Sequence, residues 1–287
     1  MSSTASVRRI TPDNPAGAES LSFWFPVCIA RNWVLLRQLT MREVKSRYES
    51  SMLGIFWAFF TPLTSLLIYT FVFGYIFKGQ VLHGGKSLTG MFPLFILCGL
   101  TAYNIFSESI NSSARVIAAN ANYVKKVVFP LEILPVSNLL AACYFGVIWF
   151  LITIAGIALA LHRISLTAVC LPLLMIPLLL FCIGLCWIVA SLGVYIRDTP
   201  HFIGIILLIM LYMTGIFYSP AILPPLFQKI LFLNPLAVIV EQIRRVLLFG
   251  EWPQWGPVAV VTAVSIVLAQ AGYMWFTRTK KGFADVI

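Results

Sequence analysis

Charged residues are scarce in this 287-residue sequence, making up 10% of the chain, whereas a soluble globular domain carries about 25%. Hydrophobic residues make up 60%, and the mean hydropathy is +0.92. This shortage of charge excludes an ordinary soluble domain and predicts an integral membrane protein with several helices. The 20 Lys and Arg outnumber the 10 Asp and Glu. We assign that excess to basic loops beside anionic headgroups rather than to nucleic acid.

Residues that carry catalysis or bind metals are also few. The three histidines are isolated, and the six cysteines lie in apolar surroundings without a His or carboxylate to complete a metal site. Residues 79–87 approach a phosphate-binding loop, but Gln80 stands where the G-x-x-x-x-G-K-[ST] pattern requires glycine. We therefore expect no catalytic site, no metal and no cofactor on this chain. Any ATP and Mg²⁺ would be bound by a separate ATPase partner.

Apolar stretches are abundant. Residues 53–77 carry no charge over 25 positions, and a helix of that length covers roughly 37 Å against about 30 Å of hydrocarbon. The sequence predicts six such spans, at about 53–77, 89–110, 134–161, 167–196, 202–218 and 256–276. No charge lies at the centre of a span, which argues against a transporter driven by a bound ion gradient.

The second span ends in a polar run that contains Glu108. We expect Glu108 to lie at the membrane face where this helix ends. The alternative is a position along a water-filled path.

Basic residues set the expected orientation. Fourteen of the 20 Lys and Arg fall on the side of the N-terminus and six on the opposite side. The positive-inside rule therefore places both termini in the cytoplasm, as an even number of spans requires.

The N-terminal region divides in two. Residues 1–20 are polar and contain Pro and Gly, so we expect a disordered tail. Residues 21–50 predict a basic amphipathic helix in the membrane interface, the alternative being a surface helix of a small soluble domain. Its basic residues are candidates for contact with a lipid diphosphate or, equally, with any anionic lipid. They are Arg31, Arg37, Arg42, Lys45 and Arg47.

Residues 219–250 contain two apolar helical pieces separated by Asn234-Pro235, each too short to span alone. We expect a re-entrant helical hairpin at the outer face, shielded by other spans or by a second copy because lipid cannot satisfy a broken backbone.

Aromatic residues are frequent within the spans. They are open to two interpretations, namely packing and lipid contact, or the lining of a passage for a sugar polymer. Our candidates for lining are Trp57, Tyr69, Tyr103, Phe106, Tyr212, Phe217 and Tyr218.

The loop after the second span carries a short predicted helix before Pro130. Tyr123 could insert into a groove of a partner while Lys125 and Lys126 stay at its rim. A plain basic loop on the cytoplasmic side explains the same residues equally well.

Several motifs, taken in order, resemble the type-2 ABC transporter permeases that export polysaccharides such as O-antigen or teichoic acid. The run RYESSMLG at 47–54 is similar to the start of their first span, and NANYVKKVVFP at 120–130 to their coupling helix. Arg197-Asp198 resembles the pair in their second cytoplasmic loop, Asn234-Pro235-Leu236 with Arg244 their outer re-entrant region, and KGFAD at 281–285 their C-terminus. The resemblance covers residues 30–287.

This resemblance implies an all-α permease domain over residues 51–287 in the cell inner membrane, paired with an identical second copy and with two ATP-binding cassette subunits. It implies that the cassette subunits dock on a coupling helix at about 117–130 and that the complex exports a lipid-linked polysaccharide, nearest to O-antigen. The residues that it assigns to coupling are Asn122, Tyr123, Lys125, Lys126, Phe129, Arg197 and Asp198.

Two other functions stay open. An ABC exporter of a small lipid or drug would share the architecture, and the sequence separates the two poorly. A membrane glycosyltransferase would need an acidic or metal-binding constellation, which we do not find in the sequence.

Overall fold

The computed structural model describes residues 25–47, 49, 51–76, 80–83, 86–89, 91–124, 129–162 and 165–286. Almost all of this part is helical, which confirms the predicted all-α membrane fold. The expected disordered tail at 1–20 lies outside the described residues.

Five helices in the described part are long and apolar enough to cross a membrane. Three of them begin or end in another helix type: α4 continues into a π-helical turn at Thr70–Ile76, and a 3-10 turn at Leu166–Cys170 precedes α8. The last continues through a 3-10 turn, Lys280–Gly282, into α13 at Phe283–Val286. The five are α4 (Phe56–Tyr69), α5 (Phe92–Ala119), α7 (Ile133–Leu161), α8 (Leu171–Tyr195) and α12 (Trp255–Thr279).

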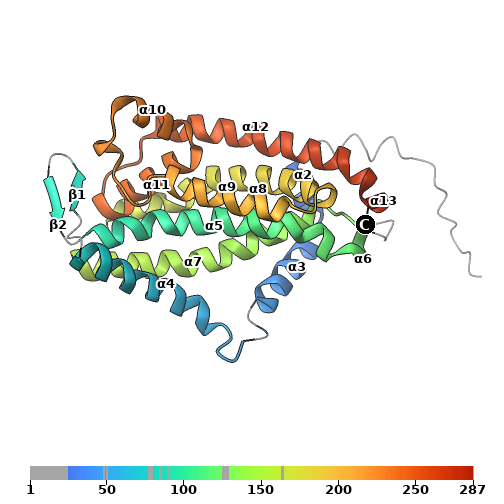
Figure 1. Cartoon of the computed structure of the whole chain (residues 1–287), viewed down its shortest axis with the longest axis horizontal. Helices are drawn as coiled ribbons and strands as arrows, with labels where there is room; N and C mark the ends of the chain where they lie inside the picture. Colours follow the sequence, from blue (N-terminus) through green and yellow to red (C-terminus); the bar gives the residue numbers. More distant parts are fainter. Residues whose placement is uncertain are drawn as a thin grey trace, which may run out of the picture.

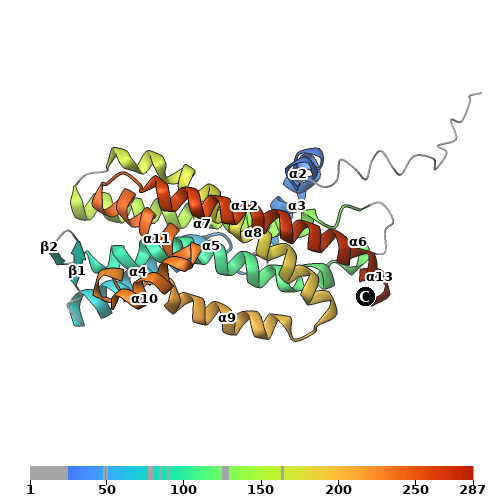
Figure 2. The same cartoon turned by 90° about the horizontal axis from the view of Figure 1, so that it is seen from above.

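A shorter apolar helix, α9 (Thr199–Met213), has 15 residues and extends about 22 Å. Figure 2 shows α9 running along the bundle from the end of α8 to α10. It runs between opposite ends of the bundle, but its 15 residues are fewer than the roughly 20 that a membrane-spanning helix needs, so the fifth predicted span stays a prediction. It stops five residues before the predicted end at 218, because the chain turns at Gly215, where φ is +69°.

The two ends of the bundle differ. Helices α3, α6 (Ala121–Val124) and α13 gather at one end, which we call the α6 end (Figure 1). The opposite end, the α10 end, holds α10 and a short antiparallel hairpin of β1 (Gln80–His83) and β2 (Lys86–Thr89), in which Gln80 pairs with Thr89. This hairpin was not predicted from the sequence.

Helix α5 forms the centre of the bundle and packs against α7, α8, α9 and α11. In an apolar stretch of 18 residues in α5, 83% of the residues are buried inside the protein. In the corresponding stretch of α4 and its π-helical extension, 11% are buried. The apolar core therefore lies around α5, and α4 lies at the edge, with most of its surface free.

Glycines allow the helices to approach closely. A Cβ on Gly272 of α12 would overlap the backbone of Gly184 on α8, and a Cβ on Gly193 would overlap the carbonyl of Ala114 on α5. Small residues at helix crossings are a usual means of packing in membranes, where apolar burial does not drive association between helices.

The predicted break at Asn234 is present. Helices α10 (Pro225–Leu233) and α11 (Pro235–Arg244), the latter extended by a π-helical turn at Arg245–Phe249, meet at 101°. A 3-10 turn, Pro220–Ile222, precedes them. Asn234 caps α11 by accepting a hydrogen bond from the Leu236 amide at 3.0 Å and donates to the Met213 carbonyl at 3.3 Å.

Two predicted boundaries differ from the structure. The amphipathic region is two helices, α2 (Phe25–Arg31) and α3 (Trp33–Ser46), because Asn32 leaves helical geometry and donates to the Cys28 carbonyl at 2.9 Å. Helix α5 runs to Ala119 instead of 110, so residues 117–119 of the expected coupling helix belong to α5, and the short α6 follows.

Glu108 therefore lies inside a helix and not at its end. Serine and asparagine did not end this helix, because its opposite face is buried in the bundle, at Ile110 and Ala114 among others.

Candidate functional site

The segment predicted to couple to a partner is held against α3 by side chains. Arg42 on α3 donates from Nη1 to the Tyr123 hydroxyl at 3.0 Å and from Nη2 to the Asn120 side-chain oxygen at 3.1 Å. The Tyr123 ring stacks on Phe129, with centroids 4.3 Å apart and an interplanar angle of 10°. The planar guanidinium thus joins the amphipathic helix to the turn that carries α6.

Arg42 is also hydrogen-bonded to Glu43 at 2.8 Å, and this bond raises the pKa of the Arg42 guanidinium. Its charge is therefore permanent, as expected for arginine. Arg42 was a candidate for contact with a lipid diphosphate or any anionic lipid, and in the structure it donates to Tyr123, Asn120 and Glu43. Asn122 is exposed, whereas Lys125 and Lys126 lie outside the described residues.

The other predicted basic residues are exposed on α2 and α3. Arg37 and Lys45 lie on the side of α3 that faces away from buried Leu36 and Leu39, and Arg31 is exposed at the end of α2. Helix α3 packs on α7 through its apolar side. The amphipathic pattern is therefore real, and its apolar side is at least partly covered by protein.

Arg197 and Asp198 are exposed in the turn between α8 and α9. The Asp198 carbonyl accepts from the His201 amide at 3.0 Å at the start of α9. This turn lies at the same end of the bundle as α6 (Figure 2). The two predicted coupling segments, 74 residues apart between Tyr123 and Arg197, are thus presented on one end of the molecule.

A second group of polar contacts at the α6 end was not predicted. Glu132 is only 7% exposed, and its two carboxylate oxygens accept hydrogen bonds from Lys280 Nζ at 3.1 Å and 3.3 Å. One of these oxygens also accepts a hydrogen bond from Cys28 Sγ at 3.7 Å. The Trp187 indole donates to the Glu132 carbonyl at 2.9 Å. This Glu132 cluster ties α2, α7, α8 and the end of α12 together. Burial and the Glu132 charge raise the pKa of the Cys28 thiol to about 11.

Arg47 pairs with Glu108 at 2.8 Å, and its guanidinium lies 4.6 Å from the centre of the Phe145 ring. The pair stands in a cleft of about 230 Å³ between α4, α5 and α7. The cleft has polar lining from Thr61, Asn104 and Ser107 and aromatic lining from Phe145 and Trp149. A cleft of this kind can hold a ligand that has both hydroxyl groups and apolar faces.

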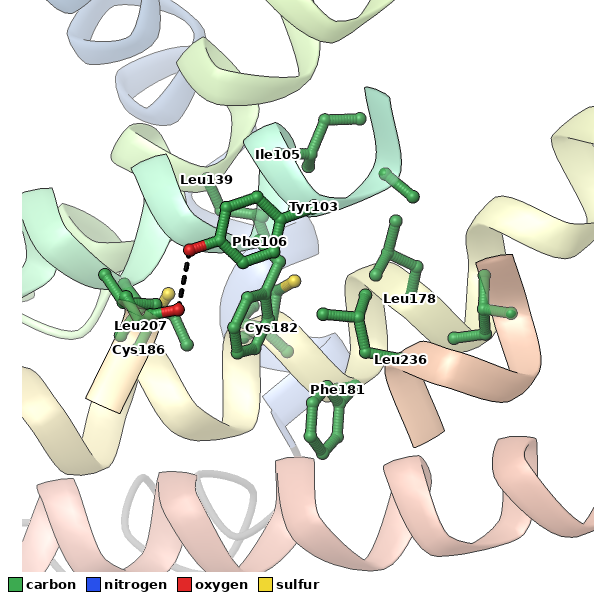
Figure 3. Packing of buried hydrophobic residues seen from close by; sticks show 14 of the residues in the cluster. Tyr103, Ile105, Phe106, Leu139, Leu178, Phe181, Cys182, Cys186, Leu207 and Leu236 are labelled. Atoms are coloured by element: carbon green, nitrogen blue, oxygen red, sulfur yellow. Dashed lines mark hydrogen bonds between the residues drawn. The ribbon is translucent and has the colours of Figure 1, made fainter. Parts of the chain in front are cut away.

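The structure places the seven candidate lining aromatics in three locations. Trp57 is partly exposed near the start of α4. Tyr103 and Phe106 are buried in the core: the Tyr103 hydroxyl donates to the Leu207 carbonyl at 2.7 Å, and Phe106 stacks on Phe181 (Figure 3).

The other four meet at the α10 end. Phe217 lies 6.3 Å from Tyr69 and 5.8 Å from Tyr212 between ring centroids, and the Tyr218 hydroxyl donates to the Tyr212 carbonyl at 2.8 Å. Within a single chain, these rings therefore form a cluster at one end of the bundle.

The broken pair at the α10 end is fixed by Arg244, whose side chain is 1% exposed. Arg244 Nε donates to the Phe95 carbonyl at 3.2 Å, and Nη2 donates to the carbonyls of Gly215 and Ile216 at 3.0 and 2.9 Å. The guanidinium also lies 3.5 Å from the centre of the Phe95 ring and 3.5 Å from a Glu241 carboxylate oxygen. Arg244 thus satisfies carbonyls of a turn that lipid could not solvate.

Comparison with known proteins gives concordant results. Residues 34–248 match the family described as ABC-2 type transporter. The chain is 29% identical over 258 residues to the O-antigen export system permease protein RfbA of Klebsiella pneumoniae, covering 88% of this chain and 95% of that protein. It is 27% identical over 256 residues to the RfbA protein of Myxococcus xanthus, with the same coverage. It is also 27% identical over 248 residues to the polysialic acid transport protein KpsM of Escherichia coli, covering 84% of this chain and 92% of that protein.

Proposed function

The chain belongs to the ABC-2 type transporter family, and from this premise we propose that it is the permease subunit of an ATP-driven exporter of a lipid-linked polysaccharide, most closely O-antigen. The observation that carries the proposal is the similarity to O-antigen permeases over 88% of the chain. The similarity to KpsM, a polysialic acid transport protein, also supports a polysaccharide as the cargo. A small lipid or drug is the alternative cargo.

Energy for export comes from a separate ATPase, since the sequence lacks a phosphate-binding loop of the required spacing. The ATPase docks at the α6 end, on α6 itself and on the turn that carries Arg197 and Asp198. Asn122, Tyr123, Lys125, Lys126 and Phe129 belong to this docking region. ATP and Mg²⁺ are bound by the partner and not by this chain.

The α6 end faces the cytoplasm, and both termini lie on that side of the inner membrane. The bias of Lys and Arg supports this orientation. Six crossings by α4, α5, α7, α8, α9 and α12 satisfy it, provided that α10 and α11 enter and leave the membrane from the outer side. The 101° bend and the anchoring of Arg244 to carbonyls support such a re-entrant pair.

The coupling step passes from the ATPase through α6 to α3. Movement of α6 displaces the Tyr123 hydroxyl and Asn120, and both hold Arg42 of α3. Because α4 is the next helix after α3 in the chain, the displacement reaches the edge helix of the bundle. Within its own chain, α4 has little buried surface that would oppose this displacement.

Two copies of the chain form the passage. Six helices are few for enclosing a polymer, and the exposed apolar surface of α4 supports contact with a second copy. Arg31, Arg37 and Lys45 are placed to meet the diphosphate of the lipid carrier or other anionic lipid.

The proposal is tested by deleting the gene and measuring polysaccharide. We expect surface polysaccharide to disappear while its lipid-linked precursor accumulates inside the cell, and we expect a plasmid copy to restore export. The matched variants are Tyr123→Phe, which keeps the ring, and Tyr123→Asp, which puts a carboxylate into the docking surface. Tyr123→Phe should restore export and Tyr123→Asp should not. Unchanged surface polysaccharide after deletion would contradict the proposal and favour a small lipid or drug as cargo.

A further inference from the structure

Helix α5 carries one polar face in an otherwise buried helix. Between residues 93 and 117, every residue that is not buried is polar or charged, and these residues repeat at intervals of three, one and three along the helix, which places them on one face. We call this face the α5 stripe. It consists of Asn104, Ser107, Glu108, Asn111, Ser112 and Arg115.

The stripe lies at a depth where hydrocarbon is expected. Helix α5 has 28 residues, or about 42 Å, and exceeds the roughly 30 Å of bilayer hydrocarbon. Asn104 is near its midpoint, and the stripe runs from there about 16 Å toward the α6 end. Amide and hydroxyl groups facing lipid would lose their hydrogen bonds to water without replacement. The stripe therefore faces water or a polar cargo.

Hollows flank the stripe on both sides. The cleft between α4, α5 and α7 reaches Asn104, Ser107 and Glu108 and brings the Trp149 ring to that side. A second hollow of about 330 Å³ between α5 and α9 reaches Ser107, Glu108 and Asn111 and has Tyr103 in its wall. Ser107 and Glu108 line both, so the stripe forms a ridge between two hollows that each include an aromatic residue.

The charge on the stripe suits a neutral, hydroxyl-rich ligand. Glu108 is neutralised by Arg47 at 2.8 Å, and most of the remaining groups are amides and hydroxyls. Amides donate and accept hydrogen bonds at the same time, as sugar hydroxyls require. Aromatic rings beside them offer a surface for the apolar faces of sugar rings. An ion path would instead present unpaired charge of one sign.

We propose that the α5 stripe is the inner wall of the polysaccharide passage and binds the sugar units directly, from the cytoplasmic face to the middle of the membrane. This inference rests on the proposed function and assigns its cargo-binding surface. Tyr103 and Phe106, two of the aromatic residues predicted to line the passage, are mostly buried. We therefore assign the lining of the inner half of the passage to the polar face between the two hollows.

Four serines on this one helix provide a matched test. Ser107 and Ser112 belong to the stripe, whereas Ser109 and Ser113 are 0% exposed on the opposite side. Each is replaced by cysteine in a chain whose six native cysteines have been replaced by alanine, and the variant is assembled with its ATPase. Ser109→Cys and Ser113→Cys change one atom of a side chain outside the proposed wall, so both unmodified variants should export polysaccharide to within about twofold of the parent. Export by every variant is measured before and after modification, so that each variant serves as its own reference.

The variants are treated with water-soluble methanethiosulfonate reagents of increasing size, and both labelling and export are measured. We expect Ser107→Cys and Ser112→Cys to be labelled at least ~10-fold faster than Ser109→Cys and Ser113→Cys, because a buried thiol reacts slowly. We expect lipid-linked polysaccharide to slow this labelling, and larger adducts to reduce export progressively.

Three results would overturn the inference. Equally slow labelling at all four positions, in a complex that exports, would mean that protein such as the second copy covers the stripe. Fast labelling with export unaffected by the largest adduct would mean that the stripe is wet but is not the wall. If the unmodified complex exports a small lipid and no polysaccharide, the proposed function fails, and this inference fails with it.

Discussion

Two arginine sites at opposite ends of the bundle use the same guanidinium group differently. Arg244 at the α10 end is 1% exposed and bonds to three backbone carbonyls, so its partners can move only if the chain itself moves. Arg42 at the α6 end has a side chain that is 43% exposed and bonds to the side chains of Tyr123, Asn120 and Glu43. Side-chain partners can be exchanged at little cost, because water replaces them.

This difference indicates that the α10 end is a fixed brace and the α6 end is a place where contacts are remade. It agrees with the proposed division of labour, in which the ATPase acts on the α6 end while α10 and α11 stay anchored to α5. The predictions below test that contrast by removing contacts at each end.

The largest effect is expected at Arg244. Replacing it with alanine removes the Arg244 donors from the carbonyls of Phe95, Gly215 and Ile216 in a buried site, at a cost on the order of 3–5 kcal/mol in the free energy of unfolding. We expect poor yield and a large fall in the Tm of the purified protein in detergent. Arg244→Lys should not restore the Tm. A lysine ammonium group lacks the planar, forked donors with which arginine binds carbonyls of two separate segments at once. An unchanged Tm in Arg244→Ala would contradict the conclusion that Arg244 holds the α10 end in place.

A smaller loss is expected in the Glu132 cluster. Lys280→Met removes the cation beside Glu132, a residue that is only 7% exposed. We expect a loss of about 2 kcal/mol in the free energy of unfolding. Lys280 is itself one-third exposed, which limits the effect.

The matched control for this cluster is the double variant Glu132→Gln with Lys280→Met, measured by chemical denaturation. Because the two residues contact each other, the loss in the double variant should be less than the sum of the single losses. Additive losses would show that the contact does not contribute.

At Arg42 we expect a small change in the free energy of unfolding and a larger change in the coupling between the ATPase and the permease. Arg42→Ala removes the hydrogen bonds of a side chain that is 43% exposed, so it should change the free energy of unfolding by about 1 kcal/mol or less. The permease-dependent stimulation of ATP hydrolysis should nevertheless fall severalfold, because α6 is no longer tied to α3.

Tyr123→Phe is the control for Arg42→Ala, since it removes one of these hydrogen bonds and keeps the ring stacked on Phe129. It should lower the stimulation less than Arg42→Ala, and adding it to Arg42→Ala should have no further effect. Full stimulation in Arg42→Ala would remove α3 from the coupling path.

The smallest effect concerns Cys28. With a pKa of about 11 instead of 9.0, its thiolate fraction at pH 8 is about 100-fold lower than that of an ordinary thiol. Burial and the Glu132 charge both raise the pKa, so Glu132→Gln should lower it and speed alkylation of Cys28. The rate is measured by mass spectrometry of the Cys28 peptide between pH 7 and pH 10. A rate that is unaffected by Glu132→Gln would show that the carboxylate does not act on this thiol.

Five of the six predicted spans correspond to helices that are long and apolar enough to cross a membrane, because long uncharged runs such as residues 53–77 have few other stable structures. The break at Asn234-Pro235 was also predictable, since proline cannot continue the preceding helix. The end of α5 was not, because tertiary packing keeps residues 111–119 helical despite two asparagines and several serines in and before this stretch.

Residue pairs far apart in sequence could not be predicted at all. Arg42 and Tyr123 are 81 positions apart, and Glu132 and Lys280 are 148 apart. The sequence showed that residues 31–47 are basic but not whether a given charge faces lipid or protein. The structure directs Arg42 to α6 and Arg47 to Glu108, and it leaves Arg31, Arg37 and Lys45 exposed.

The central claim is that this chain moves polysaccharide only when a separate ATPase acts on its α6 end. The most direct measurement is the transfer of lipid-linked polysaccharide across proteoliposomes that contain the purified chain, with and without its ATPase. The account predicts transfer that requires both the ATPase and ATP and that is lost in Tyr123→Asp. Transfer by the chain without any ATPase would contradict it.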